Sequence, residues 1–484
     1  MNQNVVLRML GLLLLGFSVT LLPPVVVSWL FADGEWLAFV KAFALVGAVG
    51  LLAWWPNRHV TRELRLRDGF VLVTLFWAVI GMAGALPLVF ADRPELDFAG
   101  AMFEAVSGFT TTGATVISGL DSLPRSVLWY RQQMQWLGGG GIIVLAVALL
   151  PVLGVGGMQL YRAEAPGAVK DQQLTPRLMQ TAKMLSLVYL LLTVACAAAY
   201  HIAGMELFDA VAHAFSTVST GGFSTHDASL GYFHNPNIEW VAILFMFLGG
   251  VNFTLHFLAL LKGGGLRQYW SDPEFRGYCA VLLLMALFMA FYLWNHSVHP
   301  SPGMTLRHAT FAWVAMQTTT GFVTEGFQSW PGPLPPLLIL ATFIGGCAGS
   351  SAGGMKLIRW QLVAREAQAE MRRLIHPSAE VLVKYAGRPV PPRVLSAVAG
   401  FFAVYLLLFG VLMLALMMTG MDQISAWSAV ATTLNNTGTG LGSVSASFQH
   451  LTDAGRWIAV AAMLLGRLEV FTVLVVFTPA FWRR

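Results

Sequence analysis

The chain is poor in charged residues. Asp, Glu, Lys and Arg make up 11% of its 484 residues, whereas 56% are hydrophobic. Soluble domains carry about 25% charged residues, so this composition excludes an ordinary soluble protein. Three cysteines at widely separated positions exclude a disulfide framework and a cysteine metal cluster. Neither a Gly-Lys-Ser/Thr phosphate loop nor a dinucleotide glycine fingerprint is present, so any nucleotide control requires another subunit.

Apolar stretches of membrane-spanning length recur along the whole chain. A helix needs about 20 apolar residues to cross a bilayer. We therefore predict an all-α integral membrane protein with ten crossings, at 5–31, 36–55, 69–91, 127–150, 184–204, 238–261, 277–295, 336–356, 394–419 and 457–480.

Basic residues are distributed unevenly between the predicted loops. If the N-terminus is cytoplasmic, most of the 29 Lys and Arg residues fall in cytoplasmic segments, with a dense group from Lys356 to Arg393. This positive-inside pattern predicts that both termini are cytoplasmic. It also explains the net charge of +5 without a nucleic-acid partner. The predicted outer loops hold only Arg93, Arg125, Arg131, Arg307 and Arg456.

Four short stretches rich in Thr, Ser and Asn each end in glycine within this apolar chain. Their closing glycines lie 109, 99 and 117 residues apart, which indicates one module used four times. Each stretch lies at the C-terminal end of a short apolar segment or directly after it. These segments are too short to span a membrane and are typical of re-entrant helices. These segments are 98–109, 207–218, 307–317 and 424–434.

The four modules predict an ion-conducting pore. Irregular backbone at membrane depth is tolerated where it lines a watery cavity, and glycine allows carbonyl groups to turn inward. Rings of carbonyls can replace the hydration shell of a monovalent cation. The fourth loop differs most from the others, so exact fourfold symmetry is not expected. The predicted selectivity filter consists of Thr111, Thr112, Gly113, Thr220, Gly221, Gly222, Thr319, Thr320, Gly321, Asn436, Thr437 and Gly438.

The predicted organisation is an N-terminal helix pair followed by four M1-P-M2 repeats, as in potassium channels. Each repeat has a spanning helix, a short pore helix with its loop, and a second spanning helix. The pair occupies 1–67, and the repeats occupy 68–160, 161–265, 266–392 and 393–484.

The second helix of each repeat carries glycine at one register position, except in the fourth repeat. Gly139, Gly250 and Gly346 occupy this position in the first three repeats, and Arg467 occupies it in the fourth. A charged side chain at membrane depth generally faces a cavity or a partner. We expect Arg467 to project toward the axis below the filter and oppose a cation. It can also pair with Glu469 or with exposed carbonyls.

The second helix of the third repeat contains a run of small residues. Glycine costs about 1 kcal/mol relative to alanine in a helix, so the helix should break or bend there. A small-residue surface for close helix packing is the alternative. We hypothesise a flexible gate, held closed partly by Arg467. The candidate gate residues are Gly345, Gly346, Gly349, Ser350, Ser351, Gly353, Gly354, Lys356 and Arg467.

With these residues assembled, the chain resembles the Trk/Ktr/HKT superfamily of potassium transporters, and within it the bacterial TrkH type. The resemblance covers essentially the whole chain. Besides the four loops, it rests on the segments 345–356, 466–471 and 161–167. The extra N-terminal helix pair matches the TrkH type better than the eight-helix KtrB type.

The resemblance implies a potassium-uptake subunit that forms a homodimer in the bacterial inner membrane. Potassium would be the transported ion, no cofactor would be covalently bound, and a cytoplasmic TrkA-type nucleotide-binding subunit would regulate the channel. It further implies that the filter carbonyls select potassium, that 345–356 is the gate, and that Arg467 opposes permeation. Plant relatives in this superfamily that prefer sodium commonly have serine at the first filter glycine, so Gly113 favours potassium here. The segment 357–393 can dock such a partner, or lie as a solvated face near anionic headgroups.

Two rival functions are considered. A symporter that couples potassium to sodium or protons is the alternative, and Glu104 and Glu469 are its candidate proton carriers. We expect the remaining acidic residues near the loops to attract cations to an outer vestibule. An enzyme is not expected, because no nucleophile-base set stands out and the histidines lack metal-ligand spacing. These histidines are His201, His213, His226 and His234, and the vestibule acids are Asp92, Asp97, Asp121, Asp209, Asp227, Glu325 and Asp422.

Overall fold

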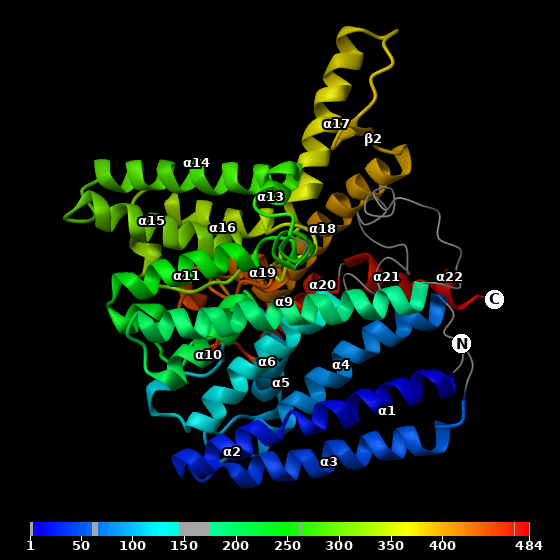
Figure 1. Ribbon diagram of the computed structural model, residues 1–484, viewed down its shortest axis with the longest axis vertical. Helices are drawn as coiled ribbons and strands as arrows, with labels where there is room; N and C mark the ends of the chain where they lie inside the picture. The colour runs from blue at the N-terminus through cyan, green and yellow to red at the C-terminus, as the bar shows by residue number, and fades with distance from the viewer. Residues whose placement is uncertain (1–2, 61–65, 145–173, 262, 469, 484) are drawn as a thin grey trace.

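The computed structural model describes residues 3–60, 66–144, 174–261, 263–468 and 470–483, which are almost entirely α-helical. Most long helices lie side by side, and the helices nearest the two chain ends lie at the same end of the bundle (Figure 1). The fold is that of an all-α membrane protein, as predicted.

The N-terminal pair packs α1 (Gln3–Val19) and α2 (Leu22–Phe31) against α3 (Trp36–Trp54), which ends in a 3-10 turn at Trp55–Asn57. The prediction had one continuous helix at 5–31. The structure starts a second helix at Leu22, where Pro23 and Pro24 lack the amide hydrogen that a continuous helix requires. Residues Gln3–Phe31 together still form one apolar stretch long enough to span a membrane, as predicted.

Four units of similar design follow the N-terminal pair. The first contains α4 (Leu66–Phe90), α5 (Phe98–Phe109) and α6 (Arg125–Val144). The second contains α9 (Leu174–Ile202), α10 (Leu207–Val218), α11 (Pro236–Gly249) and α12 (Phe253–His256), which continues as a π-helix at Phe257–Leu261. The third contains α14 (Pro273–Asn295), α15 (Pro302–Gln317) and α16 (Leu334–Ile344). The fourth contains α18 (Pro392–Met418), α19 (Gln423–Leu434), α20 (Asp453–Arg467) and α21 (Val470–Phe477).

Shorter elements join these helices. Helix α13 (Arg267–Ser271) precedes the third unit, and α22 (Pro479–Trp482) follows the fourth. The remaining 3-10 turns are Leu120–Ser122, Ser229–Phe233, Phe327–Ser329 and Gly442–Val444.

The short pore helices form where the sequence predicts them. Helices α5 and α10 have the predicted bounds, and α19 begins one residue early. Helix α15 begins at Pro302 rather than 307, because the Ser301 side chain accepts a hydrogen bond from the Met304 amide and Pro302 occupies the first turn.

The second helices of the repeats are less regular than predicted. Among the described residues, six helices are long and apolar enough to cross a membrane, or seven if the bent pair α11 and 253–260 is one span. The predicted break in the third repeat is confirmed, since α16 ends at Ile344 and Gly345 has a φ of 70°. The crossing predicted at 238–261 is not a straight helix. That helix bends by 99°, and the Asn252 side chain caps the new segment by accepting from the Thr254 amide.

In the fourth repeat, α20 ends at Arg467 and α21 begins at Val470. The span predicted at 457–480 is therefore described as two helices, and residue 469 between them lies outside the described residues. The predicted span at 127–150 is described only as far as Val144.

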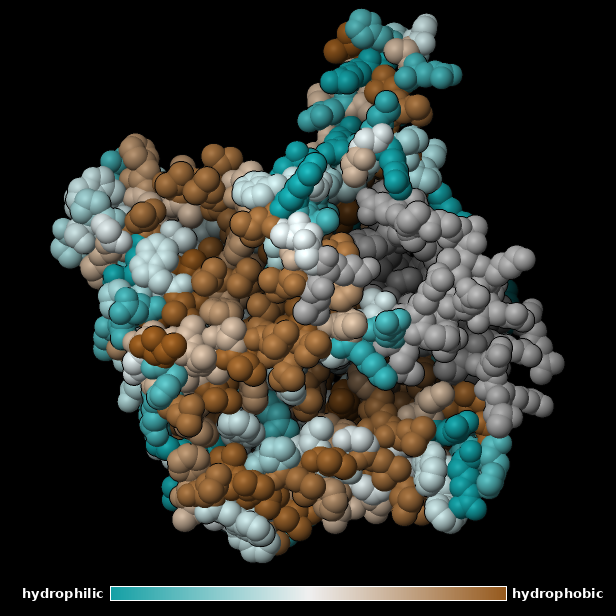
Figure 2. Space-filling view, viewed as in Figure 1, coloured by the Kyte–Doolittle hydropathy of each residue, from teal (hydrophilic) through white to brown (hydrophobic). Residues whose placement is uncertain are grey.

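A broad apolar surface covers the flank of the bundle, and hydrophilic residues gather at one end and over α17 (Figure 2). Exposed large side chains on the spanning helices include Leu52, Leu284 and Leu407. An apolar surface of this extent suits contact with lipid.

Helix α17 (Leu357–Ile375) projects from the bundle together with the hairpin β1 (Lys384–Tyr385) and β2 (Arg388–Pro389) (Figure 1). The hairpin folds back on the helix, because Leu362 and Ala369 pack in one cluster with Val383 and Tyr385. The segment predicted at 357–393 is therefore an ordered projection.

Candidate functional site

The four Thr-Gly loops meet around one centre. Each closing glycine lies against the carbonyl oxygen of the residue before the closing glycine of the next repeat. A methyl group on the glycine would fall well inside 3.0 Å of that oxygen, a separation real side chains essentially never show. Because the fourth repeat contacts the first, the contacts form a closed ring. The pairs are Gly113 with Gly221, Gly222 with Thr320, Gly321 with Thr437, and Gly438 with Thr112.

All four loops share one backbone conformation. The closing glycines have φ values of 79°, 81°, 75° and 84° in chain order. Two residues earlier, Thr111, Thr220, Thr319 and Asn436 have φ values of 52°, 52°, 57° and 56°. This left-handed region is rare for threonine, and residues held in it cluster at functional sites.

The pore helices hold these loops through equivalent hydrogen bonds. In each repeat the amide before the closing glycine donates to the carbonyl five residues earlier, at distances of 2.7 to 2.8 Å. The donors are Thr112, Gly221, Thr320 and Thr437, and the acceptors are Ser107, Ser216, Ala315 and Thr432. These amides are therefore satisfied by the pore helix, which leaves the carbonyls to face other groups.

The loop side chains pack behind the backbone. The hydroxyls of Thr110 and Thr112 lie 2.7 Å apart, and those of Thr318 and Thr320 lie 2.8 Å apart. In the fourth loop, Asn436 Nδ2 donates to Thr112 Oγ1 at 3.0 Å. These side chains brace the loops against each other.

The loops are not equivalent in every bond. Gln135 of α6 donates to the Gly221 carbonyl at 2.7 Å, and Thr439 donates to the Gly321 carbonyl at 2.6 Å. A carbonyl oxygen has two lone pairs, so each can still face a cation. The departure from fourfold symmetry involves Thr439 of the divergent fourth loop, as the sequence suggested.

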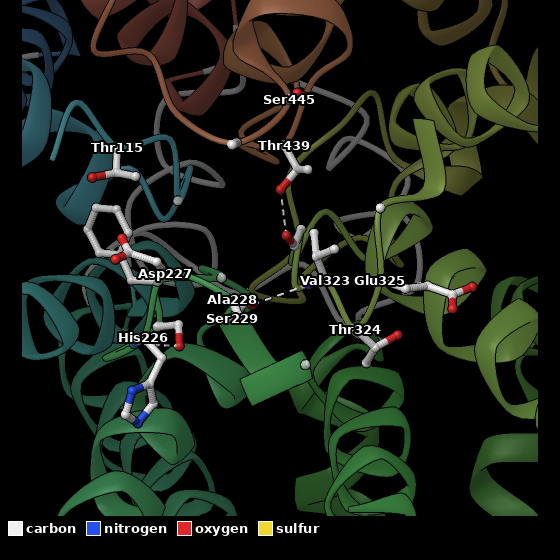
Figure 3. Close-up of a pocket in the computed structure, with 18 of the residues that line it drawn as sticks. Thr115, His226, Asp227, Ala228, Ser229, Val323, Thr324, Glu325, Thr439 and Ser445 are labelled. Carbon is white, nitrogen blue, oxygen red and sulfur yellow. Dashed lines mark hydrogen bonds between the residues drawn. The ribbon is translucent and has the colours of Figure 1, made fainter. Parts of the chain in front are cut away.

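An open cavity of about 360 Å³ lies above the ring. Its lining comes from all four repeats, and Figure 3 shows Thr115, Asp227, Glu325 and Thr439 around one centre. Asp227 and Glu325 supply acidic groups, as expected of a vestibule.

Two of the expected vestibule acids have another role. Asp97 caps α5 through the Gly100 amide, and Asp422 caps α19 through the Ser425 amide. A capping aspartate stabilises the start of a helix, so both carboxylates help to fix the pore helices. The sequence signal for these caps is an Asp before a short apolar run.

His226 lies at the edge of the outer cavity between two carboxylates. Its Nδ1 lies 2.5 Å from Asp121 Oδ1, and its Nε2 lies 3.4 Å from Asp209 Oδ2. Burial opposes the charged form, but the hydrogen bonds with Asp209 and Asp121 raise the pKa of His226 above its ordinary value. The described residues hold no group of three or more His, Cys, Asp or Glu side chains that could bind a metal ion.

The segment 345–356 lies directly beneath the ring and bonds to three repeats. The amide of Ser351 donates to the Gly249 carbonyl at 3.3 Å, and its hydroxyl donates to the Val218 carbonyl at 3.0 Å. The amide of Gly353 donates to Thr319 Oγ1 at 2.6 Å. The remaining contacts join Cys347 to Gly250, Gly349 to Phe253 and Gly354 to Asn435. The segment therefore fills the space under the pore helices.

Glu274, at the start of α14, bonds to this segment and to the start of the helix that follows it. Its Oε1 accepts from the Ala348 amide at 2.8 Å and from the Ile358 amide at 3.2 Å. The sequence analysis missed Glu274, because Asp272-Pro273-Glu274 looks like an ordinary helix start. Only the amides that face it reveal this role.

Arg467 reaches the same segment from α20. Its side chain is 5% exposed, and Nη1 donates to the Ser351 carbonyl at 3.0 Å. Among the described residues, its Nε and Nη2 have no hydrogen-bond partner. Glu469, the other expected partner, lies outside the described residues. The charge therefore points at the candidate gate, with two donors left for water or an exposed carbonyl.

The expected equivalence of Gly139, Gly250 and Arg467 in the second helices is supported by the contacts of the glycine that precedes each of them. Gly138 and Gly249 lie against the carbonyls of Phe109 and Val218, at the ends of their pore helices. Gly466 lies in the same way against Leu434. The next residues in these helices are Gly139, Gly250 and Arg467. In the third repeat, Gly345 instead contacts Gly353 of its own loop.

Lys356 ends the candidate gate. Its Nζ donates to the Ala352 carbonyl, and its φ of 72° turns the chain into α17. The remaining predicted gate residues, Gly346 and Ser350, lie within the loop, where the Ser350 hydroxyl donates to the Cys347 carbonyl at 2.6 Å.

Arg131 does not lie in an outer loop as predicted. It is a residue of α6, it is fully buried, and its Nε lies 2.7 Å from Glu104 Oε1 on α5. Glu104, a candidate proton carrier, is thus paired. A buried charge of this kind requires a partner, so the prediction failed because the partner is distant in sequence.

Comparisons with known proteins agree over the full chain. Residues 36–484 match a family model described as "TrkH: Cation transport protein". The chain is 50% identical over 483 residues to the "Trk system potassium uptake protein TrkH" of Escherichia coli (strain K12), covering 100% of both chains. It is 51% identical over 484 residues to the protein of the same name from Vibrio parahaemolyticus, again covering 100% of both.

A solved structure is similar as well. The crystal structure of the potassium transporter TrkH from Vibrio parahaemolyticus superimposes with a TM-score of 0.93 at 48% identity, covering 100% of both chains. The segment 161–167, one of the motifs behind the predicted resemblance, lies outside the residues that the structure describes.

Proposed function

The chain belongs to the TrkH family of cation transport proteins, and on this premise we propose that it is the potassium-conducting subunit of a bacterial Trk-type uptake system. The predicted resemblance is confirmed. The expectation that the chain is not an enzyme is also confirmed, because the family and its relatives are described as transport proteins.

The observation that carries the proposal is the closed ring of four glycine–carbonyl contacts. Four loops of the same conformation surround one centre, beneath an outer cavity lined in part by Asp227 and Glu325. Carbonyl oxygens in such rings replace the water around a potassium ion. The ring supports Gly113, Gly222, Gly321 and Gly438 as filter residues.

Conduction is proposed to be gated beneath the filter. The segment 345–356 fills the space under the ring, and Arg467 adds a positive charge against it. In this closed arrangement a cation leaving the filter meets both a steric and an electrostatic barrier. Opening requires the segment to leave its contacts with the second, third and fourth repeats.

The assembly is part of the same proposal. We propose a homodimer in the inner membrane with both termini cytoplasmic, regulated by a TrkA-type nucleotide-binding subunit that docks on α17 and its hairpin. This projection exposes Leu374, Ile375 and Leu382 beside the basic residues Arg372 and Lys384. An exposed apolar tip with a basic rim suits a protein partner.

The geometry favours conduction over proton coupling. Glu104 is bonded to Arg131, to Thr115 and to the Val116 amide, so this carboxylate is not free to carry protons. The other candidate, Glu469, lies outside the described residues. A reversal potential that tracks the potassium gradient alone, with no response to sodium or pH gradients, is the expected behaviour.

The experiment that tests the filter is Gly222→Ala, with Gly410→Ala as its matched control. A methyl at Gly222 overlaps the Thr320 carbonyl, whereas a methyl at Gly410 meets nothing within 4 Å. Both variants are reconstituted in liposomes, and potassium and sodium fluxes are compared at equal protein content. Gly222→Ala should lose potassium flux or selectivity, and Gly410→Ala should retain both. Full selectivity in Gly222→Ala would refute the filter.

A further inference from the structure

A buried ion pair lies behind the first loop. Glu104 and Arg131 have fully buried side chains, and Nε of the arginine lies 2.7 Å from Oε1 of the glutamate. The Glu104 carboxylate also accepts from the Val116 amide at 3.1 Å and from the Thr115 hydroxyl at 3.0 and 3.1 Å. Both Thr115 and Val116 belong to the irregular segment that follows Gly113. The carboxylate therefore fixes the backbone just above the first loop.

The arginine carries this connection to the second loop. Nη1 of Arg131 donates to the Ser224 carbonyl at 3.1 Å, and Nη2 donates to Thr115 Oγ1 at 3.1 Å. Its guanidinium also lies 4.2 Å from the centre of the Phe223 ring. Phe223 and Ser224 directly follow Gly222, as Thr115 and Val116 closely follow Gly113. One guanidinium therefore contacts the residues just after the closing glycines of two neighbouring loops, which we call the loop exits.

The second repeat continues the network with neutral groups. His213 of α10 occupies the register position of Glu104, seven residues before the left-handed residue of its loop. Its Nε2 lies 2.9 Å from the hydroxyl of Ser224, which occupies the position of Thr115. The network therefore runs from Glu104 through Arg131 to His213, and each step rests on a buried hydrogen bond.

The third and fourth repeats lack these groups. The positions of Glu104 and His213 are held by Ala312 and Ala429, and those of Thr115 and Ser224 by Val323 and Gly440. The polar brace thus belongs to one half of the ring. A buried ion pair costs solvation free energy, so it is weak evidence for stability alone. Its position beside two loop exits indicates a role in their spacing.

We propose that Glu104 and Arg131 are positioning residues that set the spacing of the first and second loops and thereby the preference for potassium over sodium. The inference rests on the proposed function. Glu104 has a second task in this proposal. Arg131 lines the outer cavity, and the carboxylate cancels a positive charge that would repel entering cations.

Three substitutions separate the two tasks. Arg131→Lys keeps the charge but loses the bridge to Ser224. Glu104→Gln keeps the shape but leaves the arginine charge uncompensated. The double variant Glu104→Gln with Arg131→Gln removes both charges. Each is reconstituted at equal protein content, and two quantities are measured. These are the potassium-to-sodium permeability ratio from the reversal potential, and potassium flux at low potassium concentration.

The permeability ratio should fall at least tenfold in all three variants. Potassium flux at low concentration should fall at least fivefold in Glu104→Gln and recover in the double variant, because only the former leaves a bare positive charge. Glu206→Gln is the matched control, since Glu206 forms a 3.1 Å pair with Arg125 and neither residue lines the outer cavity. The control should keep the wild-type ratio.

A merely structural role predicts a different pattern, with less protein recovered but an unchanged ratio in what remains. That pattern would overturn the proposal. Thr115→Val serves if the charged variants do not fold, because it removes only the hydroxyl that bridges the pair, and it should lower the ratio at least threefold. An unchanged ratio in Thr115→Val would likewise overturn it. Liposomes that hold the wild-type chain together with its regulator and still show no potassium flux would instead refute the proposed function.

Discussion

Loss of Glu274 should open the pathway without any regulator. One oxygen of this carboxylate accepts from the Ala348 amide, within the segment beneath the ring, and from the Ile358 amide, in the first turn of α17 just after that segment. If that segment is the gate, it must move away from α14 when the pathway opens. Glu274→Ala removes both bonds. In the closed state the two buried amides then have no acceptor, whereas in the open state they are exposed and lose nothing, so the substitution destabilises the closed state alone.

The size of the effect follows from the two bonds. A hydrogen bond contributes about 1 kcal/mol net, and about 1.5 to 3 kcal/mol when one partner is charged. Two bonds therefore stabilise the closed form by at least about 2 kcal/mol, because the amides bind water once the segment moves. Since 1.4 kcal/mol is tenfold in an equilibrium, the open fraction should rise about 30-fold. Glu274→Gln retains one acceptor and should have a smaller effect.

The assay is potassium flux into liposomes that contain the chain alone. Asp272→Ala is the control, because Asp272 caps the same helix by accepting from the Phe275 amide at 2.8 Å but does not bond to the segment. A lost cap costs about 1 kcal/mol of helix stability, so the control reproduces local destabilisation. Equal, low flux in Glu274→Ala and wild type, at equal protein content, would show that Glu274 does not hold a gate.

Three further predictions test the region around the ring. Arg467→Ala should raise potassium flux about tenfold or more, because it removes a charge-assisted bond to the segment as well as the charge itself; flux equal to wild type would count against a gating role. Gly353→Ala should also raise flux without a regulator, since a methyl there overlaps a pore-helix carbonyl, whereas Gly303→Ala meets nothing within 4 Å and should be silent. His226 should make the stability of the folded protein depend on pH. Burial opposes its protonation, but its two aspartate partners raise its pKa in the folded state above the unfolded value of about 6.5. Its contribution to folding stability is therefore full below about pH 6.5 and is lost as the pH rises through the folded-state pKa. The melting temperature of wild type should therefore fall more between pH 6 and pH 8 than that of His226→Gln, and equal falls would contradict this.

Local signals in the sequence gave correct pore helices. Helices α5 and α10 begin and end where predicted, because in each a short apolar run is followed by a polar stretch, and Asp97 also caps α5. The break after Ile344 was also predictable, since glycine weakens a helix wherever it occurs in a dense run. These features depend on neighbouring residues alone.

Predictions that needed distant partners failed. Arg131 was counted with the outer-loop arginines, but its partners are Glu104 and the Ser224 carbonyl, 27 and 93 residues away. The bend of the second repeat between α11 and α12 was missed for a similar reason. Its freed Gly249 and Gly250 carbonyls are satisfied by the segment of the third repeat, about 100 residues later.

The amino-acid sequence by itself determined the repeat, the membrane environment and the left-handed turns, because periodicity, apolar length and glycine chemistry act locally. The tertiary structure alone decided which carbonyl each closing glycine meets, which carboxylate compensates Arg131, and which amides Glu274 holds. Those choices depend on the order of the four repeats around the centre, and bonds across that centre join residues that no local pattern relates.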